Sequence, residues 1–244
     1  MVPTINGGEP PKPMPMAIMR NAHEVIRGGM KDIQTALDKN RFQDATTLYQ
    51  DLTFFNNKHL LMEEGVEGGA KGLFQMMDDH ADGAATKAGL RERHTVLTKL
   101  EFELEEHFVT HPDLIKVKTA WANFQKENEA HLVLEESILM PCVQQMVKSG
   151  KPVKKLMKTY FMPVLTEDDA VMERFLKFGN TVLERHDGNM PRVRVFDQAF
   201  WAVATPAQWE QWSLWIKQSL TPNKYRQVMG EIKLWIDEQN SAWA

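Results

Sequence analysis

Apolar residues recur every three or four positions through much of the first 150 residues, which places them on one face of an α-helix. This spacing predicts four long helices, at about residues 16–37, 42–64, 86–107 and 112–149. Strand signals are missing, because β-branched residues do not alternate with polar ones and turn dipeptides do not stand at hairpin spacing. The chain is therefore predicted to be all-α. Four amphipathic helices with short connections favour an antiparallel up-down four-helix bundle over residues 16–149.

Glycine and proline residues predict where these helices end. The second helix is expected to stop by Gly65, because the glycines that follow make continued helix costly, at positions 65, 68, 69 and 72. A short helical piece is expected at residues 73–79, before a break at Asp82-Gly83. Pro112 suits the first turn of the fourth helix, and Pro141 is expected to kink or interrupt that helix.

The two ends of the chain differ from this central pattern. Residues 1–15 are rich in proline and are predicted to form a flexible tail. Residues 150–244 are predicted to form shorter helices, with starts at Thr166-Glu167-Asp168-Asp169, Thr205-Pro206 and Thr221-Pro222. Most of the tryptophans lie in this C-terminal region. It is expected either to pack on the bundle or to form a homodimer or partner interface, where aromatic residues are favoured.

Charge and composition exclude several classes of function. The net charge is −4 and the pI is about 6.1, so no global basic surface is expected to bind nucleic acid. The sequence has no run of about 18 uncharged apolar residues, so a membrane span is not expected. The N-terminal residues do not read as a secretory signal, which makes the cytoplasm the expected location. The chain has one cysteine, Cys142, so a metal site has to use histidines and carboxylates.

Two segments repeat one arrangement of a histidine and a glutamate: His59-Leu60-Leu61-Met62-Glu63 and His131-Leu132-Val133-Leu134-Glu135. On a helix, side chains four residues apart lie on the same face, one turn apart. A nitrogen and an oxygen placed in this way can bind one metal ion, or the carboxylate can bridge two. Each copy stands within the apolar face of its predicted helix.

Each of the four predicted helices carries one histidine on its apolar face, at positions 23, 59, 94 and 131. Burying these imidazoles together with two carboxylates would cost several kcal/mol if they stayed unpaired. A metal centre removes that cost by making the groups ligands. The predicted metal ligands are therefore His23, His59, Glu63, His94, His131 and Glu135. Mixed nitrogen and oxygen ligation suits iron, manganese or zinc.

This pattern resembles the hemerythrin-like (HHE cation-binding) family over about residues 16–149. The resemblance is carried by Ala22-His23-Glu24-Val25-Ile26-Arg27, by Leu90-Arg91-Glu92-Arg93-His94 and by residues 131–141. It implies two non-haem iron ions in a four-helix bundle, with Glu63 and Glu135 as bridges. Iron is implied by the resemblance, whereas the residues alone leave manganese and zinc open. The rival ferritin-like bundles use Glu-x-x-His, and the residue order here argues against them.

The sequence departs from the family's pattern in two places. The oxygen-carrying hemerythrins have a further histidine one turn before the third-helix ligand, where this chain has Leu90. One iron is then expected to have fewer nitrogen ligands, and open positions favour reactivity. In the family, the second helix usually continues directly into a Leu-Phe-Pro turn, whereas this chain has the glycine-rich segment 65–72 there. His80, just after it, is either a fifth imidazole ligand or a solvated loop residue.

The charged residues next to the candidate ligands have two possible roles. Glu24, Glu64 and Glu136 either orient imidazole N–H groups or are solvated helix charges. The remaining histidines are expected at the surface, at positions 107, 111 and 186.

The resemblance implies a protein that binds O2 or a related small oxidant, such as peroxide or nitric oxide, in sensing, storage or detoxification. One alternative is a di-iron oxidase or peroxidase that acts on an unidentified substrate. The other is an iron-dependent regulatory or interaction module that reports its metal state through residues 150–244.

Overall fold

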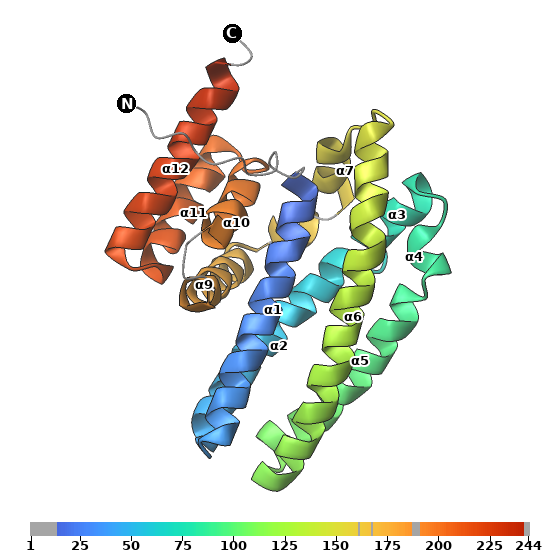
Figure 1. The fold of residues 1–244 in the computed structure, drawn as a ribbon, viewed down its shortest axis with the longest axis vertical. Coiled ribbons are helices and arrows are strands. Elements are labelled where there is room, and N and C mark those ends of the chain that lie inside the picture. The colour runs from blue at the N-terminus through green and yellow to red at the C-terminus, as the bar shows by residue number, and fades with distance from the viewer. Residues whose placement is uncertain (1–13, 161, 167, 187–190, 242–244) are drawn as a thin grey trace.

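Four long helices make up most of the first 150 residues (Figure 1). The computed structural model describes residues 14–160, 162–166, 168–186 and 191–241, and within these ranges the chain has helices and no strand. The prediction of an all-α chain is therefore confirmed. The long helices are α1 (Met14–Asp38), α2 (Phe42–Glu64), α5 (Leu90–Glu105) and α6 (Leu114–Lys148).

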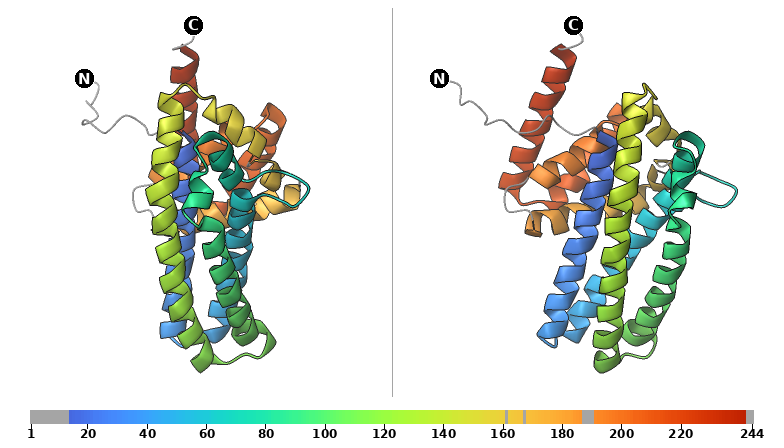
Figure 2. Two further views of the ribbon diagram at one scale, coloured as in Figure 1. Left: turned by 90° about the vertical axis from the view of Figure 1, so that its right-hand side faces the viewer. Right: turned by 45° about the vertical axis from the view of Figure 1, so that its right-hand side comes forward.

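These four helices pack against one another along their apolar faces. Helix α1 contacts α2 and α6, and helix α5 contacts α6 and α2. The link between α1 and α2 is three residues long, so the chain reverses direction there. The views in Figures 1 and 2 show α5 on the outer side of the group and α1 on the opposite side. Most of the buried side chains between them are apolar and include Ile26, Leu52, Leu97 and Leu132.

The first two helices have nearly the predicted bounds. Helix α2 ends at Glu64, and Gly65 follows with a φ of 89°, a left-handed backbone that glycine adopts most easily. Helix α1 begins at Met14, so Pro15 belongs to its first turn, where the missing proline N–H has no helical partner to lose. The rest of the predicted flexible tail, residues 1–13, lies outside the described residues.

The third and fourth helices differ from the prediction in four places. The single helix expected from residue 86 is divided, because Gly89 has a φ of 66° between α4 (Ala84–Lys87) and α5. A π-helical turn, η1 (Glu106–Thr110), continues α5. Pro112 precedes the start of α6 rather than standing in its first turn, and Asp113 caps the backbone N–H groups of residues 115 and 116. The interruption expected at Pro141 does not occur, because α6 runs through it to Lys148.

A short insertion joins α2 to α4. It holds α3 (Leu73–His80), close to the predicted piece, and an isolated antiparallel bridge between Gly65 and Lys71. Gly72 lies so close to the end of α2 that a Cβ atom there would stand 2.2 Å from the carbonyl oxygen of Glu63. Helix α3 buries Leu73, Phe74, Met76 and Met77 and contacts α2 and α6.

The described residues of the C-terminal region form six helices, and a helix begins at each of the three predicted starts. Thr205 forms a capping box with Gln208, and the third helix begins at Pro222. A helix also begins within the first predicted segment, at Asp169, but its cap is Asp168, whereas Thr166 ends α8. The helices are α7 (Val153–Tyr160), α8 (Pro163–Thr166), α9 (Asp169–His186), α10 (Pro191–Trp201), α11 (Pro206–Ser219) and α12 (Pro222–Ser241).

Helix α1 lies between the other long helices and this C-terminal region. It contacts α9 and α10 on the face turned away from α5, and Figure 2 shows the same arrangement from two further sides. From Asn21 to Met30, every residue of α1 is buried except Glu24 and Arg27. Among the described helices, none combines the length and apolar character that a membrane crossing requires.

The close approach of α9 depends on glycine in α1. A Cβ atom at Gly28 would lie 2.5 Å from a methyl group of Val182 and 2.9 Å from the ring of His186. Gly179 on α9 is equally close to the ring of Phe196. These glycines lower helix propensity, and the packing that they allow offsets that cost.

We expect Gly28→Ala to lower the free energy of unfolding by about 1–3 kcal/mol, because the added methyl group overpacks the α1–α9 contact. The matched control is Gly230→Ala in α12, where no atom lies within 4 Å of the added Cβ. That change should raise stability by about 0.5–1 kcal/mol through helix propensity alone. Urea unfolding of both variants measures the difference, and equal effects would show that α9 does not pack closely on α1.

Asp197 is a fully buried carboxyl group in the C-terminal region. Its Oδ1 atom accepts a hydrogen bond of 2.9 Å from the side-chain amide of Asn180, and its Oδ2 atom has no hydrogen-bond partner among the described residues. Burial raises the pKa of Asp197 to about 8, and the bond from Asn180 only partly opposes this. At neutral pH the folded chain therefore holds a proton here that the unfolded chain releases.

This difference predicts a pH dependence with a definite sign. Between about pH 4 and pH 8 the folded chain binds more protons than the unfolded chain at Asp197, so its contribution to stability falls as pH rises. Asp197→Asn removes the ionisation and retains the shape of the side chain. We expect the variant to match the wild type near pH 4 and to exceed its free energy of unfolding by a few kcal/mol near pH 8. Parallel unfolding curves at both pH values would refute this.

Candidate metal centre

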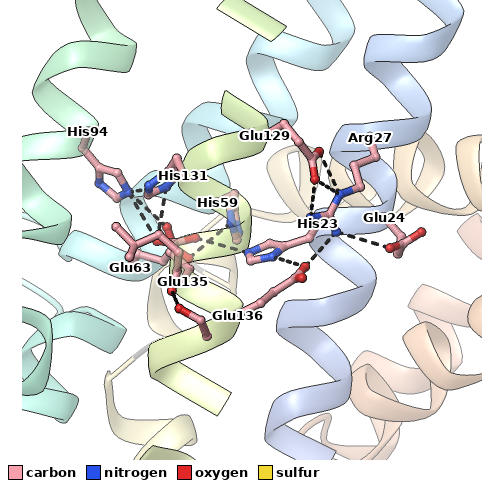
Figure 3. A network of polar contacts seen from close by, with 12 residues as sticks. His23, Glu24, Arg27, His59, Glu63, His94, Glu129, His131, Glu135 and Glu136 are labelled. Carbon is pink, nitrogen blue, oxygen red and sulfur yellow. Dashed lines mark hydrogen bonds and ion pairs between the residues drawn. The ribbon is translucent and has the colours of Figure 1, made fainter. Parts of the chain in front are cut away.

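The six predicted ligands meet at one place between the four long helices (Figure 3). Helix α1 supplies His23, α2 supplies His59 and Glu63, α5 supplies His94, and α6 supplies His131 and Glu135. All six are at most 3% exposed to solvent. They come from helices that are far apart in the sequence, so the packing of the helices creates the cluster.

Two of the helices hold their pair of residues through helical periodicity. The Nε2 atom of His59 lies 3.3 Å from a carboxylate oxygen of Glu63, and the Nε2 atom of His131 lies 3.2 Å from one of Glu135. Both pairs are four residues apart, which is the spacing that places side chains one above the other on a helix face. The repeated His-x-x-x-Glu motif therefore gives the same local geometry twice.

Contacts between helices join the two pairs. The Nε2 atom of His23 lies 3.3 Å from Glu135, and that of His94 lies 3.4 Å from Glu63 and 3.6 Å from Glu135. The Nε2 atoms of His94 and His131 are 3.1 Å apart. All four imidazoles thus present the same ring nitrogen to the two glutamates.

The cluster divides into two groups of four residues that share both glutamates. One group is His23, His59, Glu63 and Glu135, and the other is Glu63, His94, His131 and Glu135. Within each group, one ligand atom per residue can be chosen so that all four lie within 4.8 Å of one another. Donors around one ion with bonds of about 2.1 Å lie roughly 3–4 Å apart, so each group approaches the size of a metal site.

Unpaired polar atoms show that the residues suit a metal ion. Both carboxylate oxygens of Glu63 and of Glu135 are buried without a hydrogen-bond partner among the described residues, as are the Nε2 atoms of His23 and His59. Buried polar atoms in folded proteins are nearly always paired, and exceptions need an explanation. Cations placed among these oxygens and nitrogens would satisfy them.

A second pair of glutamates stands behind two of the imidazoles. The Nδ1 atom of His94 lies 2.7 Å from Glu64, and the Nδ1 atom of His23 lies 2.9 Å from Glu136. Each of these glutamates directly follows one of the shared glutamates, so the repeated motif is His-x-x-x-Glu-Glu. Of the two readings that the sequence allowed for Glu64 and Glu136, the structure supports the orienting one. Glu24 contacts Arg27 instead of an imidazole.

The protonation of the cluster follows from these contacts. Burial alone would lower the pKa of His94 and of His23, but their glutamate partners raise these values to about 11 and about 9. Burial and neighbouring positive charge lower the pKa of His59 well below its ordinary value, and burial lowers that of His131 to about 4. At neutral pH these shifts favour the charged form of His23 and His94 and the neutral form of His59 and His131, and a bound cation would take the place of the protons.

The two shared glutamates have opposite pKa shifts. Burial and the negative charge of Glu135 raise the pKa of Glu63 to about 8. Burial also disfavours the charged form of Glu135, but its contacts with His23 and His94 lower its pKa below the ordinary range. Two carboxyl groups this close cannot easily both be ionised without a cation between them.

Other candidate residues lie outside both groups. His80 ends α3, and its Nε2 atom lies 3.4 Å from the hydroxyl of Tyr160 on α7. Leu90, where the oxygen carriers have a histidine, is fully buried at the start of α5. His107 and His111 lie at the far end of α5, whereas His186 is partly buried against Asp32 of α1. Of the three histidines expected at the surface, His111 is exposed, and His107 and His186 are both partly buried.

Sequence reasoning missed the charge network around Arg27. This guanidinium donates to Glu136 at 2.7 Å and to both carboxylate oxygens of Glu129, and it pairs with Glu24 at 3.3 Å (Figure 3). Arg27 stands four residues after His23, on the same side of α1. That spacing was a usable signal, although its partners on α6 lie about a hundred residues away.

Comparisons with protein-family models, with curated proteins and with solved structures found no match to this chain. The function of the cluster is therefore inferred from its own geometry and chemistry.

The unpaired atoms predict how the metal-free chain responds to His59→Leu. Leucine has a similar volume and needs no hydrogen bond, so we expect the free energy of unfolding of the metal-free chain to rise by about 1–2 kcal/mol. Metal binding should weaken in the same variant. The matched control is Asn180→Leu, which removes the donor to Asp197 and should destabilise the chain by about 1–3 kcal/mol. If His59→Leu also destabilises the metal-free chain, the cluster serves structure.

Proposed function

We propose that this chain is a hemerythrin-like di-iron protein that binds O2 or a related small oxidant such as peroxide or nitric oxide. In this proposal α1, α2, α5 and α6 form the antiparallel up-down bundle of that class. The observation that carries the proposal is the pair of four-residue groups that share Glu63 and Glu135. Two ions placed in these groups would each have two imidazoles and would be joined by both carboxylates.

The kinds of ligand support iron. Imidazole and carboxylate suit iron, manganese and zinc, and the one cysteine of the chain, Cys142, is in neither group. The resemblance in sequence selects iron among these metals. Two nitrogens and two shared carboxylates would leave each ion with open positions, and Leu90 supplies no further nitrogen. Bound iron would supply redox chemistry toward a small oxidant at these positions.

The residues around the cluster would control orientation and access. Glu64 and Glu136 hold the Nδ1 side of two rings, so that Nε2 is the nitrogen that faces the metal. Phe74 packs against His94 with ring centroids 5.0 Å apart, and Leu90 and Leu132, which lie near His94 and His131 in the chain, are fully buried. The six ligands are almost fully buried, which favours a diatomic molecule or peroxide over a large organic substrate.

A regulatory role is the second candidate, and one contact favours it. Arg192 of α10 pairs with Glu24 of α1 at 2.7 Å, and Glu24 contacts Arg27, which holds Glu136. The C-terminal region is therefore connected by charged side chains to an imidazole of the cluster. A change in metal state would change the charge at one end of this series.

The proposal predicts two iron ions per chain after anaerobic loading with ferrous iron, measured by elemental analysis. His131→Ala and Glu135→Ala should each lose at least one ion, because each removes a ligand and leaves a cavity in its place. His80→Ala is the control and should retain both ions, since His80 contacts Tyr160 rather than the cluster. Loss of metal in His80→Ala, or fewer than one ion in the wild type, would refute the assignment.

The optical spectrum of the loaded protein then distinguishes the roles. Stable bands that depend on O2 and shift with azide would support reversible binding of a small ligand. Rapid consumption of added peroxide would support catalytic turnover instead. Metal-dependent protection of residues 191–241 in hydrogen exchange would support the regulatory role.

A further inference from the structure

The two groups of the cluster have similar ligands but different surroundings. We call His23, His59, Glu63 and Glu135 position A, and Glu63, His94, His131 and Glu135 position B. In each position one imidazole has a glutamate at its Nδ1 atom: Glu136 in position A and Glu64 in position B. The two positions therefore match in their ligands, so a difference in metal retention has to come from their surroundings.

Position A is supported by a network of charged side chains. Glu136 accepts a 2.7 Å bond from Arg27, which is itself held by a two-oxygen contact with Glu129 and by Glu24. Arg192 extends this network into the C-terminal region. Glu136 also stands in the middle of α6, a 35-residue helix. Its carboxylate therefore contacts both His23 and an arginine that other glutamates hold in place.

Position B has a weaker support. Glu64 is the last residue of α2, directly before the left-handed turn at Gly65, and helix ends open more readily than helix centres. Its side chain is 43% exposed, compared with 26% for Glu136. Among the described residues, His94 is the one partner in hydrogen-bond or ion-pair contact with Glu64. Arg91 acts on it only at longer range, because its guanidinium pairs with Asp78.

The covering of the two positions differs in the same sense. Helix α1, which carries His23, is enclosed by α2, α6, α9 and α10. Helix α5, which carries His94, lies on the outer side of the molecule (Figure 1) and exposes Val96 and Phe102. The cover over His94 is Phe74 of α3, an eight-residue helix in the insertion between α2 and α5. Fewer packed elements must therefore move to open position B.

We propose that position A retains its metal ion and that position B exchanges its ion, with Glu136 and Glu64 as the positioning residues that set this difference. This inference rests on the proposed function, since it requires two bound ions. Partners that orient a ligating histidine also raise its basicity, and their loss typically costs 10–100-fold in metal affinity. Glu64 is exposed and lies at a helix end, so it orients its histidine for a smaller fraction of the time than Glu136, which an ion-pair network holds in place.

The test follows metal release from the full chain after anaerobic loading with ferrous iron. An excess of a chromogenic ferrous chelator is added, and its colour is recorded in a stopped-flow instrument. For the wild type we expect two phases of one iron each, with rates at least about tenfold apart. Glu64→Gln keeps an acceptor for His94 but removes the charge, and it should speed the fast phase about 10–100-fold while the slow phase stays within twofold.

Glu136→Gln is the matched variant for position A and should speed the slow phase by a similar factor. Glu127→Gln is the control: Glu127 pairs with Arg93 beside His94 and contacts no imidazole, so both phases should stay within twofold. If the Glu64→Gln variant binds a single iron and releases it at the wild-type slow rate, position B has lost its ion. That result supports the inference in the same way as a faster fast phase. Circular dichroism of each metal-free variant checks that it is folded.

Three results would overturn the inference. These are a single phase in a wild type that binds two irons, an exchange of the two effects between Glu64→Gln and Glu136→Gln, and an equal effect of each variant on both phases. All three leave the di-iron proposal in place, because two irons are bound in each case. A wild-type chain that binds fewer than two irons overturns both proposals, and this is measured before any release experiment.

Discussion

The structure depends on the burial of two carboxylates and four imidazoles between four helices. Each group loses its water, and several of the atoms that face one another have no hydrogen bond within the described chain. Such a centre is costly on its own, so the apolar residues around it have to stabilise the fold. The cost also favours the binding of cations that together satisfy the six side chains, which couples metal binding to stability.

The centre has an approximate twofold character that fades with distance. Helices α2 and α6 each contribute a histidine and two glutamates, and α1 and α5 each contribute one histidine. The second glutamate of α6, Glu136, contacts the histidine of α1, and the second glutamate of α2, Glu64, contacts the histidine of α5. Beyond this shell the symmetry ends, because the C-terminal helices cover α1 while α5 remains at the outer side. Similar ligands in unequal surroundings are a means by which a protein can give two identical metals different behaviour.

The sequence predicted what helical periodicity controls, namely the all-α class, the end of α2 before Gly65 and the six residues of the cluster. It could not predict which partner Glu64 or Glu136 would choose, because these contacts span 30 and 113 positions of the chain. The break at Gly89 was missed because a lone glycine inside a helical pattern is usually tolerated. At Pro141 the buried neighbours Leu139, Val143 and Met146 hold the helix together despite the proline.

Helix α1 belongs to two packing arrangements at once. One face directs His23 toward the cluster, and the opposite face packs against α9 at Gly28. Residues 21–30 of α1 are therefore part of the packing of both halves of the chain. The halves are therefore not independent modules. A fragment ending near residue 150 would expose the apolar side of α1, the helix that positions His23. Evolutionary replacement of the C-terminal half would change the packing of α1, and with it the cluster, without replacing any of the ligands.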